Sequence, residues 1–156
     1  MIKKIAIIFV LIVSLNCERD DICIDPTTPK LLVVFYDNTN QTERKAVSNL
    51  KIEVESTDGF VEITHASNDS IAIPLRVDID LTKIKLIKKE TDQDEIIDEF
   101  TLNYVREEVF VSRSCGYKTI YPQTTQENLT QNWIASLTIN NQNVTDETAK
   151  HISIFH

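Results

Sequence analysis

The residues best suited to covalent chemistry in this chain of 156 amino acids are its three cysteines, Cys17, Cys23 and Cys115. A cysteine sulfur can attack a substrate, pair with a second cysteine or accept a modifying group. Cys115 could act as a nucleophile with His65 as its base. Residues 1–16 are typical of a secretory signal, and in an exported chain oxidising conditions favour a structural disulfide over a free thiol. We therefore expect no catalytic cysteine.

The histidines and glycines do not form a recognisable metal or phosphate motif. His65, His151 and His156 are widely spaced, and neither CxxC nor HxxxH occurs. The only glycines, Gly59 and Gly116, are too few for a phosphate loop or a dinucleotide fingerprint, and GxSxG is missing. We expect no metal site and no cofactor.

Carboxylates are the remaining candidates for catalysis, and four of them cluster at Asp94, Glu95, Asp98 and Glu99. Two carboxylates facing a sugar can hydrolyse a glycosidic bond, but an acidic solubilising surface gives the same pattern. Trp133, the only tryptophan, could stack on a sugar or fill the core. The sequence favours the acidic surface and the core tryptophan, and so a protein that is not an enzyme.

The charge balance excludes one class of partner. The chain has 16 basic and 24 acidic residues, a net charge of −8. Nucleic-acid binding requires many Lys and Arg contacts to phosphates, and adsorption to anionic lipid requires the same sign. We expect no nucleic-acid partner, and any membrane attachment must have another source.

The first 16 residues are typical of a secretory signal peptide. Lys3 and Lys4 precede the apolar run of residues 5–13, and the polar residues Ser14 and Asn16 end the apolar stretch. A membrane-spanning helix needs about 20 apolar residues, so this segment is too short to be an anchor.

The sequence SLNC at residues 14–17 resembles the lipobox of bacterial lipoproteins. The resemblance implies cleavage before Cys17, a diacylglycerol on its sulfur and attachment to the outer membrane, on its periplasmic or cell-surface side. The alternative is a secreted protein with an unmodified Cys17. The acidic residues after Cys17 resemble a surface-export signal of Bacteroidetes lipoproteins, although a solvated tether over residues 17–29 also explains them.

If lipid occupies the first cysteine, two cysteines remain in an oxidising compartment. We therefore predict a disulfide between Cys23 and Cys115. It would join the end of the tether to a point late in the sequence.

The elements that must position these residues are strands. Residues 31–36 are apolar on both faces, which suits a buried strand, whereas residues 50–55 alternate between apolar and charged side chains. Seven further alternating segments occupy residues 60–64, 70–77, 83–88, 96–105, 109–114, 133–139 and 151–155.

About nine short strands predict one all-β domain over residues 30–156. We expect an antiparallel β-sandwich, with an immunoglobulin-like form favoured and a small β-barrel as the alternative. Pro74 cannot donate a backbone hydrogen bond, so its strand should lie at a sheet edge or carry a bulge.

Asp69, Ser70 and Ile71 form the tripeptide DSI, which resembles the O-glycosylation acceptor motif of exported Bacteroidetes proteins, with Ser70 as the acceptor. More broadly, the segments CERDDIC, TTPKLLVVFYDN, DSIAIPL, VFVSRSCGYKTI and HISIFH resemble a family of uncharacterised Bacteroidetes lipoproteins, classed as a domain of unknown function. The resemblance extends over residues 17–156 and implies a location without naming an activity.

These patterns together indicate a lipid-anchored envelope protein that binds or scaffolds an envelope protein or a glycan. Two alternatives stay open: a small surface hydrolase or glycan-processing enzyme, and a carrier of a small ligand in an apolar cavity.

Overall fold

The structure is a computed structural model that describes residues 22–25, 27–89 and 94–156, with the backbone only for residues 64–67. Within these ranges the chain forms strands and no helix. The strands are β1 (Leu31–Tyr36), β2 (Val47–Ser56), β3 (Gly59–Asn68), β4 (Ser70–Ile73), β5 (Leu81–Lys89), β6 (Glu95–Asn103), β7 (Glu107–Ser112), β8 (Gly116–Ile120), β9 (Thr125–Glu127), β10 (Ser136–Ile139) and β11 (Ile152–Phe155).

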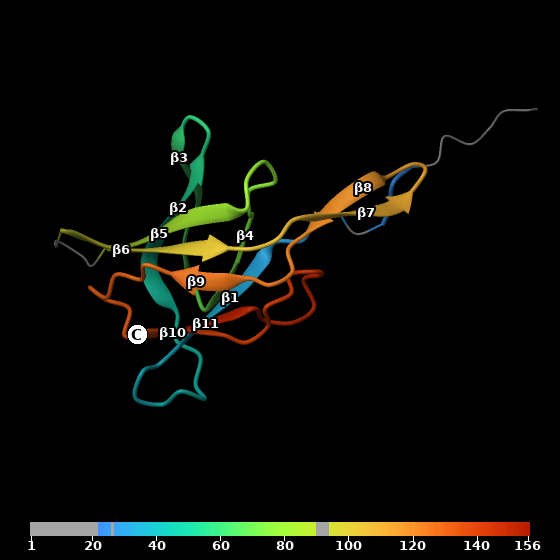
Figure 1. The fold of residues 1–156 in the computed structure, drawn as a ribbon. Helices are drawn as coiled ribbons and strands as arrows, with labels where there is room; N and C mark the ends of the chain where they lie inside the picture. Colours follow the sequence, from blue (N-terminus) through green and yellow to red (C-terminus); the bar gives the residue numbers. More distant parts are fainter. Residues whose placement is uncertain (1–21, 26, 90–93) are drawn as a thin grey trace, which may run out of the picture.

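Two sheets make up the body of the molecule (Figure 1). One has the order β10-β11-β1-β4 and the other the order β3-β2-β5-β6-β9. Apolar side chains from both sheets form one buried cluster, so the prediction of an all-β sandwich is confirmed. Sheets of four and five strands are also found in variable-type immunoglobulin domains. None of the described sheets closes into a barrel, so the alternative fold does not apply.

The strand patterns follow from burial. In β1 the side chains of Leu31, Val33 and Phe35 are fully buried, and β1 lies between β11 and β4. In β2 the buried side chains of Ile52 and Val54 alternate with half-exposed ones, because the other face of that sheet meets solvent.

One strand pair departs from the antiparallel rule. Strand β1 runs parallel to β11, with Val33 opposite Ile152 and Tyr36 opposite Phe155. On its other side β11 pairs with β10, so the last strand of the sequence is internal to the four-stranded sheet.

The prediction for Pro74 is confirmed. Strand β4 is the edge strand of the four-stranded sheet and ends at Ile73, directly before the proline. The strand before it in the sequence, β3, is the edge strand of the five-stranded sheet. The chain thus crosses from one sheet to the other along one open side of the sandwich.

Strands β7 and β8 form a separate hairpin that projects away from the sandwich (Figure 1). It is inserted between β6 and β9, which pair with each other. Gly116 begins β8 with a φ of 72°, a backbone conformation that glycine adopts without strain. Next to it, Cys115 forms a disulfide with Cys23, with 4.9 Å between the Cα atoms, as the sequence predicts.

The predicted signal peptide over residues 1–16 and Cys17 lie outside the described residues. Within the part that is described, we find no helix of the length and apolar character that crossing a membrane requires.

Candidate binding groove and its supporting network

An open apolar groove of about 450 Å³ lies on the side of the sandwich where the chain crosses between the sheets. Its floor includes Val54 of β2 and Leu75, both nearly buried. Its walls are β3 and the segment that follows β4. The lining residues are Val54, Glu55, Ser56, Thr57, Val61, Ile63, Pro74, Leu75, Arg76, Val77 and Asp78.

Two apolar side chains at the groove stand well out in solvent. Val61 of β3 is 51% exposed and Val77 is 55% exposed. Because β3 is an edge strand, its outer side has no neighbour among the described strands of the sheet. An exposed edge beside apolar side chains is a surface on which another extended segment can pair.

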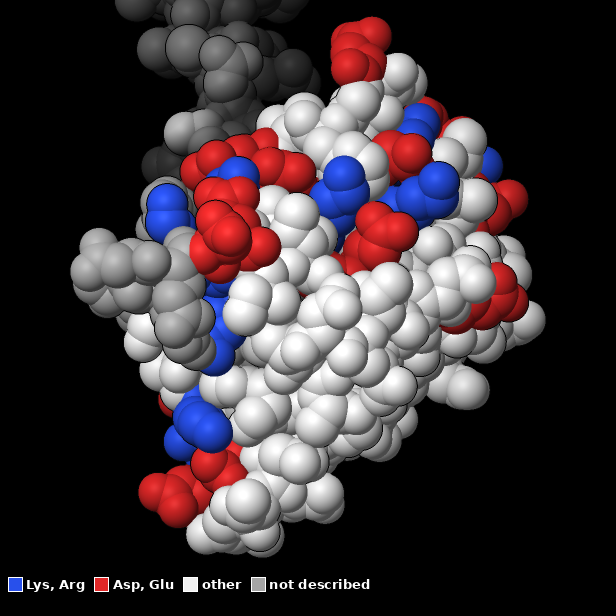
Figure 2. Space-filling model, turned by 90° about the vertical axis from the view of Figure 1, so that its left-hand side faces the viewer, with Lys and Arg blue, Asp and Glu red and all other residues white. Residues whose placement is uncertain are grey.

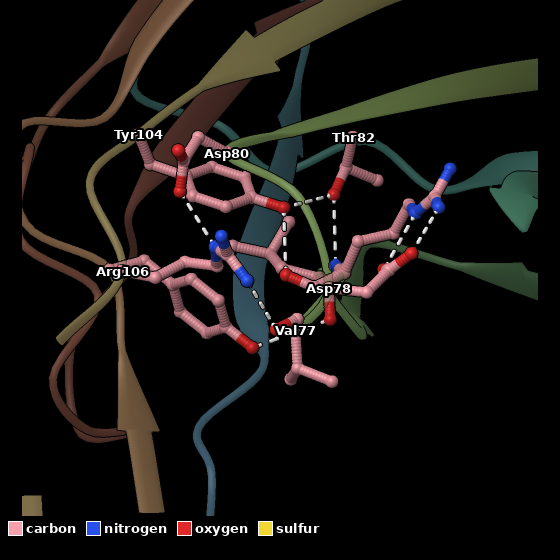
Figure 3. Close-up of polar contacts among 9 residues, drawn as sticks. Val77, Asp78, Asp80, Thr82, Tyr104 and Arg106 are labelled. Atoms are coloured by element: carbon pink, nitrogen blue, oxygen red, sulfur yellow. Dashed lines mark hydrogen bonds and ion pairs between the residues drawn. The ribbon is translucent and has the colours of Figure 1, made fainter. Parts of the chain in front are cut away.

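The wall formed by residues 75–78 is fixed by a buried hydrogen-bond network (Figure 3). The backbone N–H of Arg76 donates to Oγ1 of Thr82 (2.9 Å). The Thr82 and Tyr104 hydroxyls are 2.6 Å apart, and the Tyr104 hydroxyl donates to the carbonyl of Arg76 (3.0 Å). The side chains of Thr82 and Tyr104 are buried, so these hydrogen bonds are shielded from competition by water.

Two ion pairs extend this network to the rim of the groove (Figure 3). Arg106 donates from Nε to Asp80 (2.6 Å) and from a terminal nitrogen to the carbonyl of Val77 (2.6 Å). Arg76 pairs with Asp78 through two nitrogens. The hydrogen bond from Arg76 lowers the pKa of Asp78 to about 2, so this pair stays charged at neutral pH.

Two tyrosines connect the groove wall to the root of the β7–β8 hairpin. Tyr104 and Tyr121 flank the hairpin in sequence, and their rings meet edge to face with 4.9 Å between centroids. The Tyr121 hydroxyl donates to the carbonyl of Leu75 (3.3 Å), and burial raises the pKa of Tyr121 to about 12. The groove wall at Leu75 and Arg76 is therefore tied by hydrogen bonds to the two tyrosines at the root of the hairpin.

The predicted carboxylate cluster is not a uniform solubilising surface, because Asp98 is fully buried. Its Oδ1 accepts hydrogen bonds from the Thr130 hydroxyl (2.9 Å) and the N–H of Asn132 (2.7 Å). Its Oδ2 accepts from the N–H groups of Trp133 and Ile134, both at 2.8 Å. Four donors occupy this carboxylate, which leaves it a structural rather than a substrate-binding role.

The other members of that cluster, Asp94, Glu95 and Glu99, face solvent as expected. Among the described residues no three His, Cys, Asp or Glu side chains gather where a metal ion could bind. The disulfide also removes the thiol that a nucleophilic role for Cys115 would need.

His151 is also structural. It is buried, and its Nδ1 accepts a hydrogen bond from the N–H of Leu32 (3.0 Å). Burial lowers the pKa of His151, which keeps Nδ1 free of a proton and able to accept. His156 packs edge to face against Trp133, with 5.6 Å between ring centroids.

Trp133 and His156 also border a second, polar hollow of about 560 Å³, together with Lys45 and Lys89. The tryptophan is half-buried, packs against the core and donates from Nε1 to the carbonyl of Leu86 (3.2 Å). It is therefore mainly a core residue with one side open to this hollow.

Ser70 is exposed at the start of edge strand β4, and its hydroxyl donates to Asp69 (3.0 Å). Its position suits a modifying enzyme, and the O-glycosylation stays a prediction.

On the face shown in Figure 2, acidic and basic side chains lie next to one another in the upper part, and uncharged residues cover much of the lower part. Lysines also pair with neighbouring glutamates, as Lys51 does with Glu53 (3.2 Å) and Lys83 does with Glu55 (3.7 Å). The negative net charge is thus not gathered into one broad acidic patch on this face.

Comparison with known proteins gives one match. Residues 46–156 match the sequence model of DUF6452, described as a family of unknown function. No curated protein and no solved structure matches the chain. The matched range covers most of the chain and includes the groove, its supporting network and the β7–β8 hairpin. The chain therefore belongs to the DUF6452 family.

Proposed function

We propose that this protein is a lipid-anchored component of the outer membrane that binds an extended, apolar segment of another envelope protein in the groove between β3 and residues 74–78. It acts as a binding module rather than an enzyme. The observation that carries the proposal is the combination of an apolar groove with the open edge of β3.

An added strand satisfies both features of the groove. Its backbone would pair with the outer edge of β3, and every second side chain would point into the groove. Val61 and Val77 would then lose their exposure to water, which stabilises the complex by about 25 cal/mol for each Å² of apolar surface buried. The groove lining carries one positive charge, Arg76, and two negative charges, Glu55 and Asp78. Arg76 pairs with Asp78 and Glu55 pairs with Lys83, so an uncharged segment suits the groove better than a charged one.

The lipid anchor is supported by the signal-peptide pattern and by the lipobox resemblance at Cys17. Two or three acyl chains on one residue bind a bilayer firmly, whereas one chain binds reversibly. Mass spectrometry of the membrane-extracted protein should find residues 1–16 removed and acyl groups on Cys17. An intact leader, or an unmodified Cys17, would refute this part of the proposal.

The groove is tested by photo-crosslinking in intact cells. A photoreactive amino acid at Val77 should give a defined adduct, and mass spectrometry should place the attachment in an extended apolar segment of one envelope protein. The same probe at Ile97, which is 42% exposed on β6, is the matched control and should not give that adduct. Val61→Asp should abolish the adduct at Val77 while the protein stays folded.

The same experiment can contradict the proposal. Identical adducts at Val77 and Ile97 would indicate random collisions, and an absence of adducts at Val77 would remove the groove as a docking site. A glycan, the alternative ligand, would bind at a different place, the second hollow. Sugars stack on aromatic faces, and one side of Trp133 is open to this hollow. Glycan binding that is lost in Trp133→Phe and kept in Val61→Asp would favour that alternative.

A further inference from the structure

Exposed apolar side chains gather at the β7–β8 hairpin. The structure describes ten large apolar side chains that are exposed, and four belong to β3, β6 or the groove. The remaining six lie in the hairpin, at its root or in the segment disulfide-bonded to it: Ile22, Ile24, Val105, Val109, Phe110 and Tyr117. Such a concentration on a soluble surface marks a place where another apolar phase or molecule makes contact.

The two aromatic residues form a pair on one face of the hairpin. Phe110 and Tyr117 lie opposite each other across the strands, with 5.4 Å between ring centroids. They are 56% and 67% exposed. The segment before β1 runs beside β8, where Thr28 accepts a hydrogen bond from the N–H of Thr119 (3.0 Å).

The charges of the hairpin differ between its two ends. Arg113 and Lys118 lie toward the tip, whereas Glu107 and Glu108 begin β7 near the sandwich. Asp25 lies 3.7 Å from the sulfur of Cys115 and offsets part of the positive charge. Apolar and aromatic groups rather than net charge therefore dominate the tip.

The length of the chain limits how far the tip can be from the lipid. Cys17 precedes Cys23 by six residues, and a fully extended chain spans at most about 3.6 Å per residue, so these two residues lie within about 22 Å of each other. The disulfide then places the Cα of Cys115 4.9 Å from that of Cys23. An acyl group on Cys17 would therefore keep the hairpin tip within reach of the bilayer surface.

We propose that the β7–β8 hairpin inserts its tip into the interfacial layer of the bilayer that holds the lipid anchor, with Phe110 and Tyr117 among the headgroups. This inference rests on the lipid anchor of the proposed function. Aromatic rings are favoured at this depth because a ring with one polar end meets both water and hydrocarbon there. The hairpin is a second contact with the membrane, and it orients the sandwich relative to the surface.

The test uses the full-length lipoprotein reconstituted in vesicles whose lipids carry bromine near the headgroup end of the acyl chains. Bromine quenches tryptophan fluorescence on contact. In Tyr117→Trp, the added emission should shift to shorter wavelength, and most of it should be lost in brominated vesicles. Phe60→Trp, which introduces the same probe at an exposed aromatic position on β3, is the matched control and should keep its emission, as should the native Trp133.

Each remaining outcome overturns the inference in a recognisable way. If the protein floats with the vesicles and the Tyr117→Trp probe is quenched no more than the Phe60→Trp probe, the anchor holds and the hairpin does not insert. If the protein does not float, the anchor and the inference fail together. If the emission of Tyr117→Trp shifts to shorter wavelength without lipid, and does so more as protein concentration rises, the hairpin covers a second copy of this chain instead.

Discussion

At the scale of single residues, Asp98 holds a whole segment in place. Its carboxylate receives three backbone N–H groups and one hydroxyl from residues 130–134, which otherwise contain no regular structure. Those N–H groups have no strand partner, and a buried unpaired donor costs about 1–3 kcal/mol. The aspartate thus replaces the hydrogen bonds that a strand would supply.

We expect Asp98→Ala to lower the free energy of unfolding by more than about 3 kcal/mol, because it leaves several donors unpaired in the interior. Urea denaturation followed by circular dichroism measures this. Glu99→Ala, at the exposed neighbouring position, should change stability by no more than about 0.5 kcal/mol. Equal effects of the two substitutions would contradict a buried structural role for Asp98.

Because His151 is buried, we expect the free energy of unfolding to depend on pH. Burial lowers its folded-state pKa, so as pH falls the unfolded chain takes up a proton before the folded chain does. The contribution of neutral His151 to the free energy of unfolding should be fully present above about pH 6.5. Below that pH it should decline by at most about 1.4 kcal/mol per pH unit for one proton. His156, whose pKa is also lowered by burial, acts in the same direction.

Urea midpoints between pH 7 and pH 5 test this prediction. His151→Asn keeps an acceptor for the N–H of Leu32 and cannot be protonated in this range, so its midpoint should vary less with pH than that of the wild type. An unchanged wild-type midpoint over this range would show that His151 is not a buried neutral acceptor.

At the scale of elements, the disulfide joins the β7–β8 hairpin to the segment before β1. It closes a loop between residues 92 positions apart, for which the chain-entropy model gives about 4–5 kcal/mol as an upper value. Cys23→Ser and Cys115→Ser should each lower the melting temperature measurably. The double substitution should cost little more than either one, since a single bond is lost in every case. Additive losses would mean that each cysteine contributes separately.

Most strands can be predicted from alternating side chains, and two cannot. Strand β9 has only three residues, Thr125–Glu127, too few for a period to be visible. Strand β8 begins with a glycine, and the next four residues, Tyr117 to Ile120, do not alternate between apolar and polar side chains. The sequence alone therefore indicates a loop where β9 forms.

The candidate site is harder to predict than the fold. The disulfide follows from the number of cysteines and their compartment, and Pro74 indicates an edge strand by its chemistry alone. The groove, by contrast, joins residues 54–63 to residues 74–78, and no local pattern shows that they meet. Asp98 differs from its exposed neighbours only through its distant partners. The exposure of Val61 and Val77 marks the groove, but this exposure is known only from the structure and not from the sequence.

At the scale of the whole molecule, the position of β11 makes the sandwich depend on its last residues. Ile154 is fully buried and lies between β1 and β10, so Ile154→Ala should lower the free energy of unfolding by about 2–5 kcal/mol. Ile97→Ala removes the same atoms from an exposed position and should have little effect. Comparable urea midpoints for the two variants would contradict a central role for β11.

The parallel pairing of β1 with β11 also governs when the chain can fold. The pair brings together residues that are more than a hundred positions apart, and contacts of such separation form slowly. During synthesis β1 is made early, and it cannot pair with β11 until residues 152–155 have been added. Until then the four-stranded sheet lacks β11, one of its two internal strands, and β10 lacks the strand with which it pairs. For an exported chain, as proposed above, late closure of the sheet is compatible with passage across a membrane before folding.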